Sequence, residues 1–313
     1  HIMGWEFPYH WGGLPGALVG MREQAEGIMR SQEANGGWGF YPSEDRKSLG
    51  APGTQTMGTC AGPAYRLAKW AAISGDPAVT AAMRKALERL REFRVPRGAQ
   101  GWECPIYQPD VLGSAYGIAS HLEAYEVTGE PAYLQKAVYW ARTGICFHYT
   151  WQDAGMRPWM LYAGIPVFGT TFYTHSWMGV PVQWCSLVYA YWLQRLAQYD
   201  QSYPWVQIAE GITVSGEHQL FDFDDPKKRT GTYPDSLGRR MTAQNGPFIN
   251  PEDVLLNRMA LEGHDPEVRT VVLRSEGGRW HVTSCARMIS ATIEDGKIYA
   301  NLAFWPGESS GTM

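Results

Sequence analysis

The sequence lacks most of the features that assign a protein to a class at once. Its 5 cysteines are scattered and odd in number, and none forms a C-x-x-C pair, so neither a disulfide framework nor a structural zinc site is expected. With 27 basic residues against 31 acidic ones, the net charge is −4, which offers no positive surface for nucleic acid or an anionic membrane. No apolar run approaches the roughly 18–20 residues that a membrane-spanning helix needs, so no membrane insertion is expected.

Several catalytic signatures are missing as well. The sequence contains no Gly-rich phosphate loop, no G-x-S-x-G nucleophile elbow and no pair of histidines at metal-ligand spacing. Nucleotide-binding and serine-hydrolase functions are therefore disfavoured, and we expect no cofactor and no metal.

What the sequence does have is a large load of aromatic residues. It contains 14 Trp and 17 Tyr, in a chain that is 44% hydrophobic and 19% charged, as is typical of a packed globular protein. Amphipathic rings suit a wet cleft that grips a ligand with polar and apolar faces, although any one ring can equally pack between helices.

A short signature recurs along the chain and predicts tight corners between helices. It occurs at 74–78 (SGDPA) and 128–132 (TGEPA), with looser copies at 200–205 (DQSYPW) and 263–267 (GHDPE). Gly ends one helix in the left-handed conformation, and an acidic residue followed by Pro starts the next. Each copy therefore predicts the corner of an antiparallel helical hairpin.

Apolar residues at helical spacing flank these corners, and they define the fold that we expect. The pattern predicts a mainly α fold over residues 1–270, an (α/α) toroid or barrel of at least four antiparallel hairpins. The corners are tight and the connections between hairpins are long, so the long loops should gather on one rim, where ligands bind.

The pattern changes to alternation near the C-terminus. Residues 278–283, 287–293 and 297–304 alternate like strands, with 294–296 (EDG) as a hairpin turn. We expect an antiparallel β-sheet domain over 271–313, of which the chain holds only the beginning.

Helical hairpins followed by strands make the whole chain similar to the α/α-toroid carbohydrate-active enzymes, which include glycoside hydrolases and polysaccharide lyases. The resemblance implies a carbohydrate ligand and a role in polysaccharide degradation, in a bacterial, secreted or periplasmic setting. One branch, the β-L-arabinofuranosidase type, holds zinc with a Glu and clustered cysteines. Only Glu103 followed by Cys104 resembles that site, and the adjacent cysteine pair is missing, so the zinc is not carried over.

A second toroid family, the squalene cyclase-like terpenoid enzymes, is an alternative. The segment 32–38 (QEANGGW) matches their Q-x-x-x-G-x-W repeat, and 222–225 (DFDD) matches their D-x-D-D acid motif. That motif opens a core-facing helix in the family, whereas here it runs into the charged segment 226–229. We therefore interpret the acidic match as chance and the first match as a helix-exit turn.

Two predicted loops near the N-terminal half carry candidate site residues. Trp38 and Tyr41 follow the first helix and offer flat faces for a sugar, or plug a gap in the core. The next loop contains Trp102, Glu103 and Asp110. An apolar neighbour such as Trp102 would raise the pKa of Glu103 and suit it to act as an acid, while Asp110 could instead cap the following helix.

Two later loops supply the remaining candidates. Tyr173 and His175 could serve as proton donor and acceptor, and Asp235 is a second candidate carboxylate that no helix cap explains. Further substrate-binding candidates on the same rim are His10, Trp11, Trp177, Trp184, Arg240 and Glu252, the last of which also fits a helix start.

Three functions remain open from the sequence. Hydrolysis of a glycosidic bond needs two carboxyl groups, and Glu103, Asp110 and Asp235 are catalytic candidates for it. Elimination by a lyase would use Tyr173 or His175 as the base, with Arg240 pairing with a uronate carboxylate. A non-catalytic sugar-binding module is the third. We favour hydrolysis.

Overall fold

The computed structural model describes residues 16–151, 160–173, 177–222, 224, 227, 229–238, 244–263, 270–284 and 287–303. The helices are α2 (Gly16–Ser31), η1 (Glu44–Leu49), α3 (Met57–Ser74), α4 (Pro77–Leu90), α5 (Val111–Thr128), α6 (Pro131–Gly144), η2 (Ile145–Phe147), α7 (Gln183–Leu196), α8 (Trp205–Glu217) and α9 (Glu252–Leu261). The strands are β1 (Tyr233–Leu237), β2 (Gln244–Ile249), β3 (Val271–Ser275), β4 (Gly278–Val282), β5 (Arg287–Glu294) and β6 (Lys297–Ala303).

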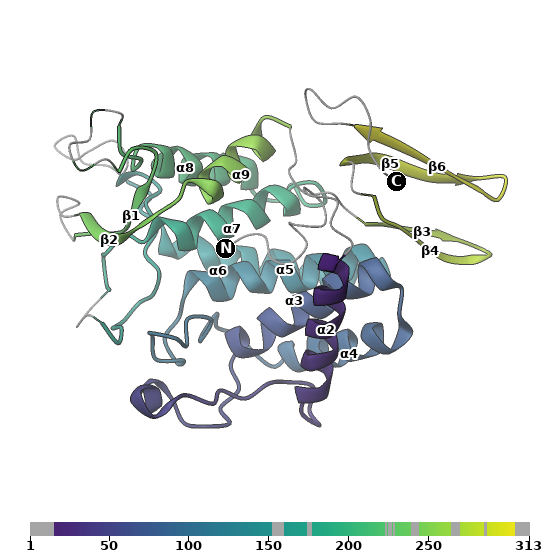
Figure 1. Ribbon diagram of the computed structural model, residues 1–313, viewed down its shortest axis with the longest axis horizontal. Coiled ribbons are helices and arrows are strands. Elements are labelled where there is room, and N and C mark those ends of the chain that lie inside the picture. Colours follow the sequence, from purple (N-terminus) through teal and green to yellow (C-terminus); the bar gives the residue numbers. More distant parts are fainter. Residues whose placement is uncertain are drawn as a thin grey trace.

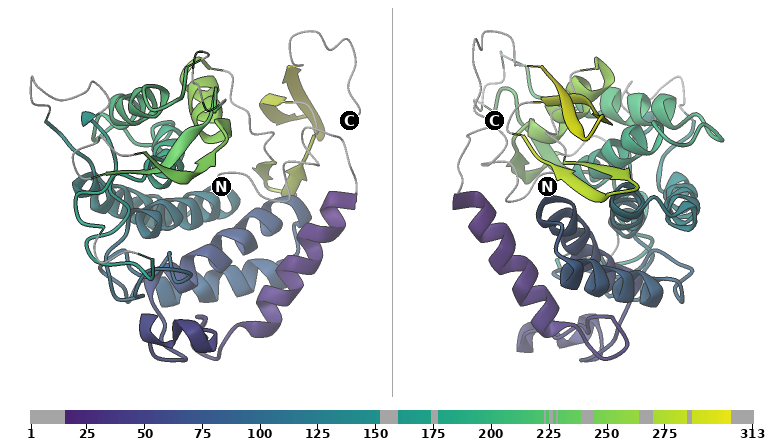
Figure 2. Two further views of the ribbon diagram at one scale, coloured as in Figure 1. Left: turned by 60° about the vertical axis from the view of Figure 1, so that its left-hand side comes forward. Right: turned by 90° about the vertical axis from the view of Figure 1, so that its right-hand side faces the viewer.

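Helical hairpins form the body of the protein, as the sequence predicts. The pairs α3–α4, α5–α6 and α7–α8 follow one another, with α2 along the outside of the first pair and α9 against the last (Figures 1 and 2). At the first corner, Gly75 takes a φ of 65° and Asp76 accepts a 2.7 Å hydrogen bond from the backbone N–H of Ala78. At the second, Gly129 takes a φ of 74° and Pro131 begins α6. Both corners are confirmed.

The two looser copies of the signature behave differently. In the third, Asp200 accepts hydrogen bonds from Ser202 and from the indole of Trp205, and α8 begins at Trp205. The fourth lies partly outside the described residues, and the strand β3 rather than a helix follows it. The expectation of a fourth hairpin there is therefore wrong, because the apolar period has already changed from helical spacing to alternation.

The core lies between the inner helices α3, α5 and α7. Every residue of α7 is buried, and α5 is buried on nearly all sides, as expected of a helix that is apolar all round. The outer helices α4, α6 and α8 bury a single face each. This two-layer arrangement holds the ends of the inner helices rigidly, and the candidate site lies at one of those ends.

The long loops meet at one end of the hairpins, as predicted. Asp110 bridges to Val167, the N–H of Ile106 donates to the carbonyl of Leu49 at 2.9 Å, and the N–H of Leu237 donates to the carbonyl of Pro181 at 2.9 Å. Figure 1 shows the β1–β2 hairpin at this end and the strands β3–β6 at the other.

At the opposite end, the β3–β4 hairpin contacts the corners. His281 donates to the carbonyl of Ala72 at 2.6 Å, and Arg274 donates to the carbonyl of Glu126 at 2.9 Å. Both acceptors belong to the last turns of inner helices, whose carbonyls have no partner within the helix. The strands therefore cap the closed end and leave the loop end to the site.

The strands form three separate antiparallel pairs, β1–β2, β3–β4 and β5–β6. The predicted strands β4, β5 and β6 are confirmed, and so is the turn between the last two, where Asp295 and Gly296 have φ values of 48° and 71°. The sequence did not predict the β1–β2 hairpin, whose first strand contains Asp235.

The two motifs shared with terpenoid enzymes have structural explanations. Gln32 donates to the carbonyls of Gly36 and Ala82, both at 3.0 Å, so its motif ends α2, as we interpreted it. Asp222 and Asp224 are exposed in the loop that follows α8 and do not open a core helix. In the described ranges, no helix is both long and apolar enough to pass through a bilayer.

Candidate active site

Glu103 lies in the loop between α4 and α5, in a turn that a buried amide fixes. The N–H groups of Glu103 and Cys104 both donate to the carbonyl of Gln100, at 3.1 and 2.9 Å. The side chain of Gln100 is fully buried and donates to the carbonyl of Pro166 at 3.3 Å. The carbonyl of Glu103 accepts a hydrogen bond from the N–H of Phe172. Two neighbouring loops thus hold the Glu103 backbone in place.

Asp235 reaches the same place from the β1–β2 hairpin. Between Pro234 and Ser236 the register of the hairpin shifts, because β1 advances by two residues and β2 by three, so Asp235 lies opposite a bulge in β2. Bulges of this kind redirect a side chain, and they are common beside active sites. The carboxylate of Asp235 accepts a hydrogen bond of 3.3 Å from the indole N–H of Trp184.

A pair of indole rings joins the two carboxyl groups. Trp102, next to Glu103, stacks on Trp184 with a centroid distance of 6.3 Å and an interplanar angle of 29°. Trp184 is buried, whereas Trp102 is 40% exposed and has a free face toward solvent. The structure therefore brings together four residues that the sequence offered as separate candidates: Trp102, Glu103, Trp184 and Asp235.

The two carboxyl groups differ in their electrostatic surroundings. Burial, and next the charge on Asp235, raise the pKa of Glu103 to about 7, and a hydrogen bond from Trp102 only partly offsets them. Burial also raises the pKa of Asp235, but the Trp184 hydrogen bond stabilises its charged form. Glu103 is thus suited to hold a proton near neutral pH, and the Trp184 hydrogen bond favours a charge on Asp235, a difference of the kind that acid–base pairs use.

Asp110 lies among the same loops but acts as a helix cap. One carboxylate oxygen accepts from the N–H of Gly113 at 2.6 Å and the other from the N–H of Ala99 at 2.9 Å. The residue is 1% exposed, and burial raises its pKa to about 7. These contacts are those of the cap alternative, and a catalytic role for Asp110 stays a prediction.

The other aromatic candidates divide between core and surface. Trp38 is buried in the core, and its indole N–H donates to the carbonyl of Ile28. The ring therefore fills a gap in the core and does not offer a face to a sugar. Trp177 is buried too and donates to the hydroxyl of Thr171 at 2.7 Å, which fixes the loop behind Glu103. Tyr41 and Tyr173 are 72% and 64% exposed.

Glu252 is exposed as the first residue of α9, where a carboxylate is favourable for a helix start. Four candidates lie outside the described residues: His10, Trp11, His175 and Arg240.

The structure adds residues that sequence reasoning missed. Arg46 of η1 stabilises the charged form of Glu103, and η1 packs on the Glu103 loop through the Leu49–Ile106 hydrogen bond. In the sequence, Arg46 lies in a run of charges that is typical of a solvated surface, and nothing marks Gln100 as buried. Phe172 is another such residue: it is 43% exposed and its ring contacts that of Tyr173. In the sequence, only its place in the same loop as Tyr173 indicated a role.

Buried thiols lie near the carboxyl groups without forming a metal site. Burial and the charge on Glu103 raise the pKa values of Cys104 and Cys185, so both are protonated. Within the part of the chain that the structure covers, no group of three or more His, Cys, Asp or Glu side chains is arranged to hold a metal ion.

Comparison with known proteins identifies the fold. No protein-family model matches the chain, and no curated protein matches it by sequence search. Among solved structures, an unsaturated glucuronyl hydrolase specific for heparin matches with a TM-score of 0.55 at 14% identity, over 83% of this chain and 71% of that one. An α-mannanase of glycoside hydrolase family 76 from Bacteroides thetaiotaomicron matches with a TM-score of 0.53 at 12% identity, over 82% and 67%.

A sugar epimerase from a ruminal bacterium matches similarly, with a TM-score of 0.52 at 13% identity over 81% of this chain and 67% of that one. All three are α/α-toroid carbohydrate-active enzymes. The chain therefore has a mainly helical fold similar to that of this class, and the resemblance that the sequence indicated is confirmed.

Proposed function

We propose that the protein hydrolyses glycosidic bonds in a polysaccharide or oligosaccharide, with Glu103 as the general acid and Asp235 as the second carboxylate. The observation that carries the proposal is the pairing of these two groups, in which burial and the charge on Asp235 raise the pKa of Glu103 to about 7. The fold is one that glycoside hydrolases use, which supports a sugar as the substrate.

In this mechanism, Glu103 donates its proton to the glycosidic oxygen as the bond to the anomeric carbon breaks. Asp235, held in its charged form by the indole of Trp184, stabilises the positive charge on the sugar as nucleophile or as base toward water. The exposed face of Trp102 offers a platform for the sugar ring directly beside the acid.

Elimination has less support among the described residues. Its candidate base Tyr173 is 64% exposed, and its other candidates, His175 and Arg240, lie outside the described residues. A general base needs a position from which it reaches a specific proton, and among the residues that the structure describes no hydrogen bond fixes the Tyr173 hydroxyl. We therefore keep lyase activity as an alternative, and the assay below detects it through unsaturated products.

A panel of neutral and uronate-containing polysaccharides tests the proposal. New reducing ends without ultraviolet-absorbing unsaturated products are expected. Glu103→Gln and Asp235→Asn should each lower the rate roughly 10²–10⁴-fold, the usual contribution of a positioned acid or base. Tyr173→Phe is the control and should stay near wild type.

Other results would contradict the proposal. Unsaturated products that vanish in Tyr173→Phe would make the protein a lyase. Conversion of a sugar to its epimer without cleavage would make it an epimerase. Sugar binding without any change of the sugar would leave a binding module.

A further inference from the structure

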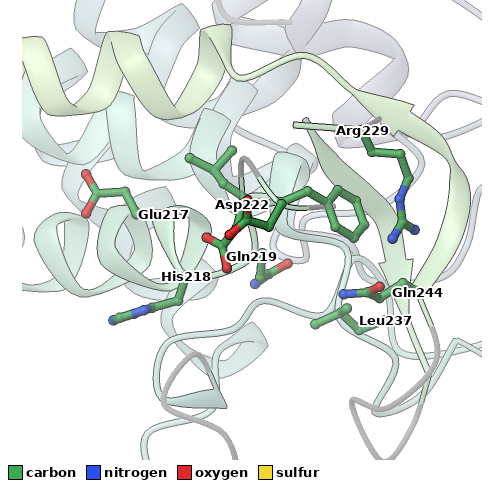
Figure 3. A pocket seen from close by; sticks show the side chains of 10 residues that line it. Glu217, His218, Gln219, Asp222, Arg229, Leu237 and Gln244 are labelled. Carbon is green, nitrogen blue, oxygen red and sulfur yellow. The ribbon is translucent and has the colours of Figure 1, made fainter. Parts of the chain in front are cut away.

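A pocket lies beside the C-terminal end of β1, the strand that contains Asp235. It has a volume of about 510 Å³, within the range of small-molecule sites, and lies between the end of α8 and the β1–β2 hairpin. Figure 3 shows Glu217 and His218 on one side, Arg229 and Gln244 on the other, and Asp222 between them. Of these five, the sequence singled out only Asp222, in the acidic match that we interpreted as chance.

The walls of this pocket, which we call the α8 pocket, are held by contacts of their own. The guanidinium of Arg229 lies 3.7 Å from the centre of the Phe221 ring and 5.0 Å from that of Phe248. The N–H of Phe221 donates to the carbonyl of Thr232, and the Thr230 hydroxyl donates to the carbonyl of Asp222. These contacts hold the described residues on the two sides of the pocket together.

Two connections join the α8 pocket to the candidate active site. Leu237 lines the pocket and follows Asp235 by two residues on β1, a span of about 7 Å in extended chain. On the other side, the buried amide of Gln219 donates to Gln183 at 3.1 Å, and Gln183 precedes Trp184, the residue that holds Asp235. The α8 pocket therefore lies close to Asp235 in the fold.

The lining defines the chemistry of the ligand. Carboxylates accept hydrogen bonds, a guanidinium donates them, and the amide of Gln244 does both. Sugar hydroxyls both donate and accept, so a polyhydroxylated ring satisfies such a mixed set. Asp222 and Asp224 are two exposed acids beside one cation, Arg229, which disfavours an anionic ring.

We propose that the α8 pocket is a binding subsite for an uncharged sugar unit of the substrate, next to the unit held between Glu103 and Asp235. This inference rests on the proposed function and deepens it. The substrate is then an oligosaccharide or polysaccharide with an uncharged sugar at this position, and binding in the pocket adds affinity for longer chains.

The test measures kcat/KM and binding with neutral manno-, cello- and xylo-oligosaccharides of two to five units. Binding is measured by titration calorimetry on the Glu103→Gln protein. In the wild type, kcat/KM should rise with chain length. Asp222→Ala and Gln244→Ala should lower kcat/KM and affinity about three- to tenfold for the longest substrate, the value of one hydrogen bond, and leave the disaccharide within about twofold.

Matched controls lie on the exposed face of α8. Glu210→Ala and Gln207→Ala remove the same kinds of group away from the pocket and should change neither value. Hydrolysis without a length dependence, or with equal losses for short and long chains, would overturn the subsite and leave the proposed function intact. Failure of every oligosaccharide to bind or to be hydrolysed would overturn both.

Discussion

At the scale of single residues, the candidate site depends on two carboxyl groups with different partners. Asp235 has an indole N–H donor at 3.3 Å, which favours its charge, and Glu103 lies buried beside that charge. The charge on Asp235 therefore favours the protonated form of Glu103. The same contacts also explain why Trp184 acts on the site by orienting Asp235, since the ring itself is buried.

The first prediction concerns pH. Because the pKa of Glu103 is about 7 and the acid form is the active one, kcat/KM should fall about tenfold per unit as the pH rises above 7. Asp235 must be ionised, so kcat/KM should also fall on the acid side. A pH–rate profile checks both limbs, and a rate that stays constant to pH 9 would contradict the acid role of Glu103.

The coupling between the two groups can be measured separately. In Asp235→Asn, the pKa of Glu103 should fall, because a neighbouring negative charge is removed, but it should remain above 4.5, because burial remains. Carbon-13 NMR titration of the Glu103 carboxyl gives the value. An unchanged pKa would show that the groups do not interact.

The sequence allowed each site residue to be proposed but not their grouping. Glu103 beside Trp102 indicated a raised pKa, and Asp235 had no simple structural role. Their meeting depends on the buried Gln100 turn and on the bulge in β2 opposite Asp235, which no local pattern predicts. Trp38 and Trp184 show the limit most clearly, because both are buried indoles in loop or helix-start positions, and only their partners distinguish core from site.

At the scale of elements, Asp110 holds the start of α5 and connects it to the loop before it. Asp110→Ala should lower the free energy of unfolding by about 2–4 kcal/mol, because the helix loses its cap and the N–H groups of Gly113 and Ala99 lose their acceptor. Asp110→Asn keeps one acceptor oxygen and should cost less. Urea denaturation measures both, and a fully stable Asp110→Asn protein without activity would instead support a catalytic role for Asp110.

The corners of the hairpins offer a second prediction at this scale. Gly75→Ala and Gly129→Ala should each cost about 1–2 kcal/mol, because a side chain is strained at their φ values of 65° and 74°. A Cβ at Gly75 would also lie 3.0 Å from the His281 ring of the docked hairpin. Gly62→Ala, inside α3 with open space around it, is the control and should be neutral or stabilising by up to about 1 kcal/mol. Equal effects at all three positions would contradict the corner assignment.

These elements show what local pattern can and cannot give. Gly and Pro mark the first two corners because their backbone preferences act at the residue itself. The β1–β2 hairpin escaped prediction because its first strand, YPDSL, contains Pro and Asp and has little strand propensity. Tertiary contacts stabilise it, including full burial of Tyr233 and the Leu237–Pro181 hydrogen bond.

At the scale of the whole molecule, a buried ionic network ties the three inner helices together. Arg195 of α7 pairs with Glu123 of α5 at 2.7 Å and with Glu126 at 2.9 Å, and Lys69 of α3 pairs with Glu123 at 3.3 Å. The side chains of Arg195 and Glu123 are only 3% and 5% exposed. The network keeps the inner helices in register and thereby keeps the loop end in place.

Removal of one member should be costly because it leaves buried charges uncompensated. Glu123→Gln should lower the free energy of unfolding by about 3–5 kcal/mol. The control Glu88→Gln breaks the pair with Arg91, whose side chains are 71% and 61% exposed, and should cost less than about 1 kcal/mol. Thermal and chemical denaturation compare the two, and similar losses would contradict the structural role of the network.

The central claim is that Glu103 protonates the leaving group of a glycosidic bond, and the dependence of the rate on that leaving group tests it most directly. The measurement compares wild type with Glu103→Gln on an unactivated oligosaccharide and on an aryl glycoside whose phenolate leaves without a proton. The account predicts a loss of roughly 10²–10⁴-fold on the oligosaccharide and a much smaller loss on the aryl glycoside. Equal losses on both substrates, or a Glu103→Gln protein as active as wild type on the oligosaccharide, would contradict it.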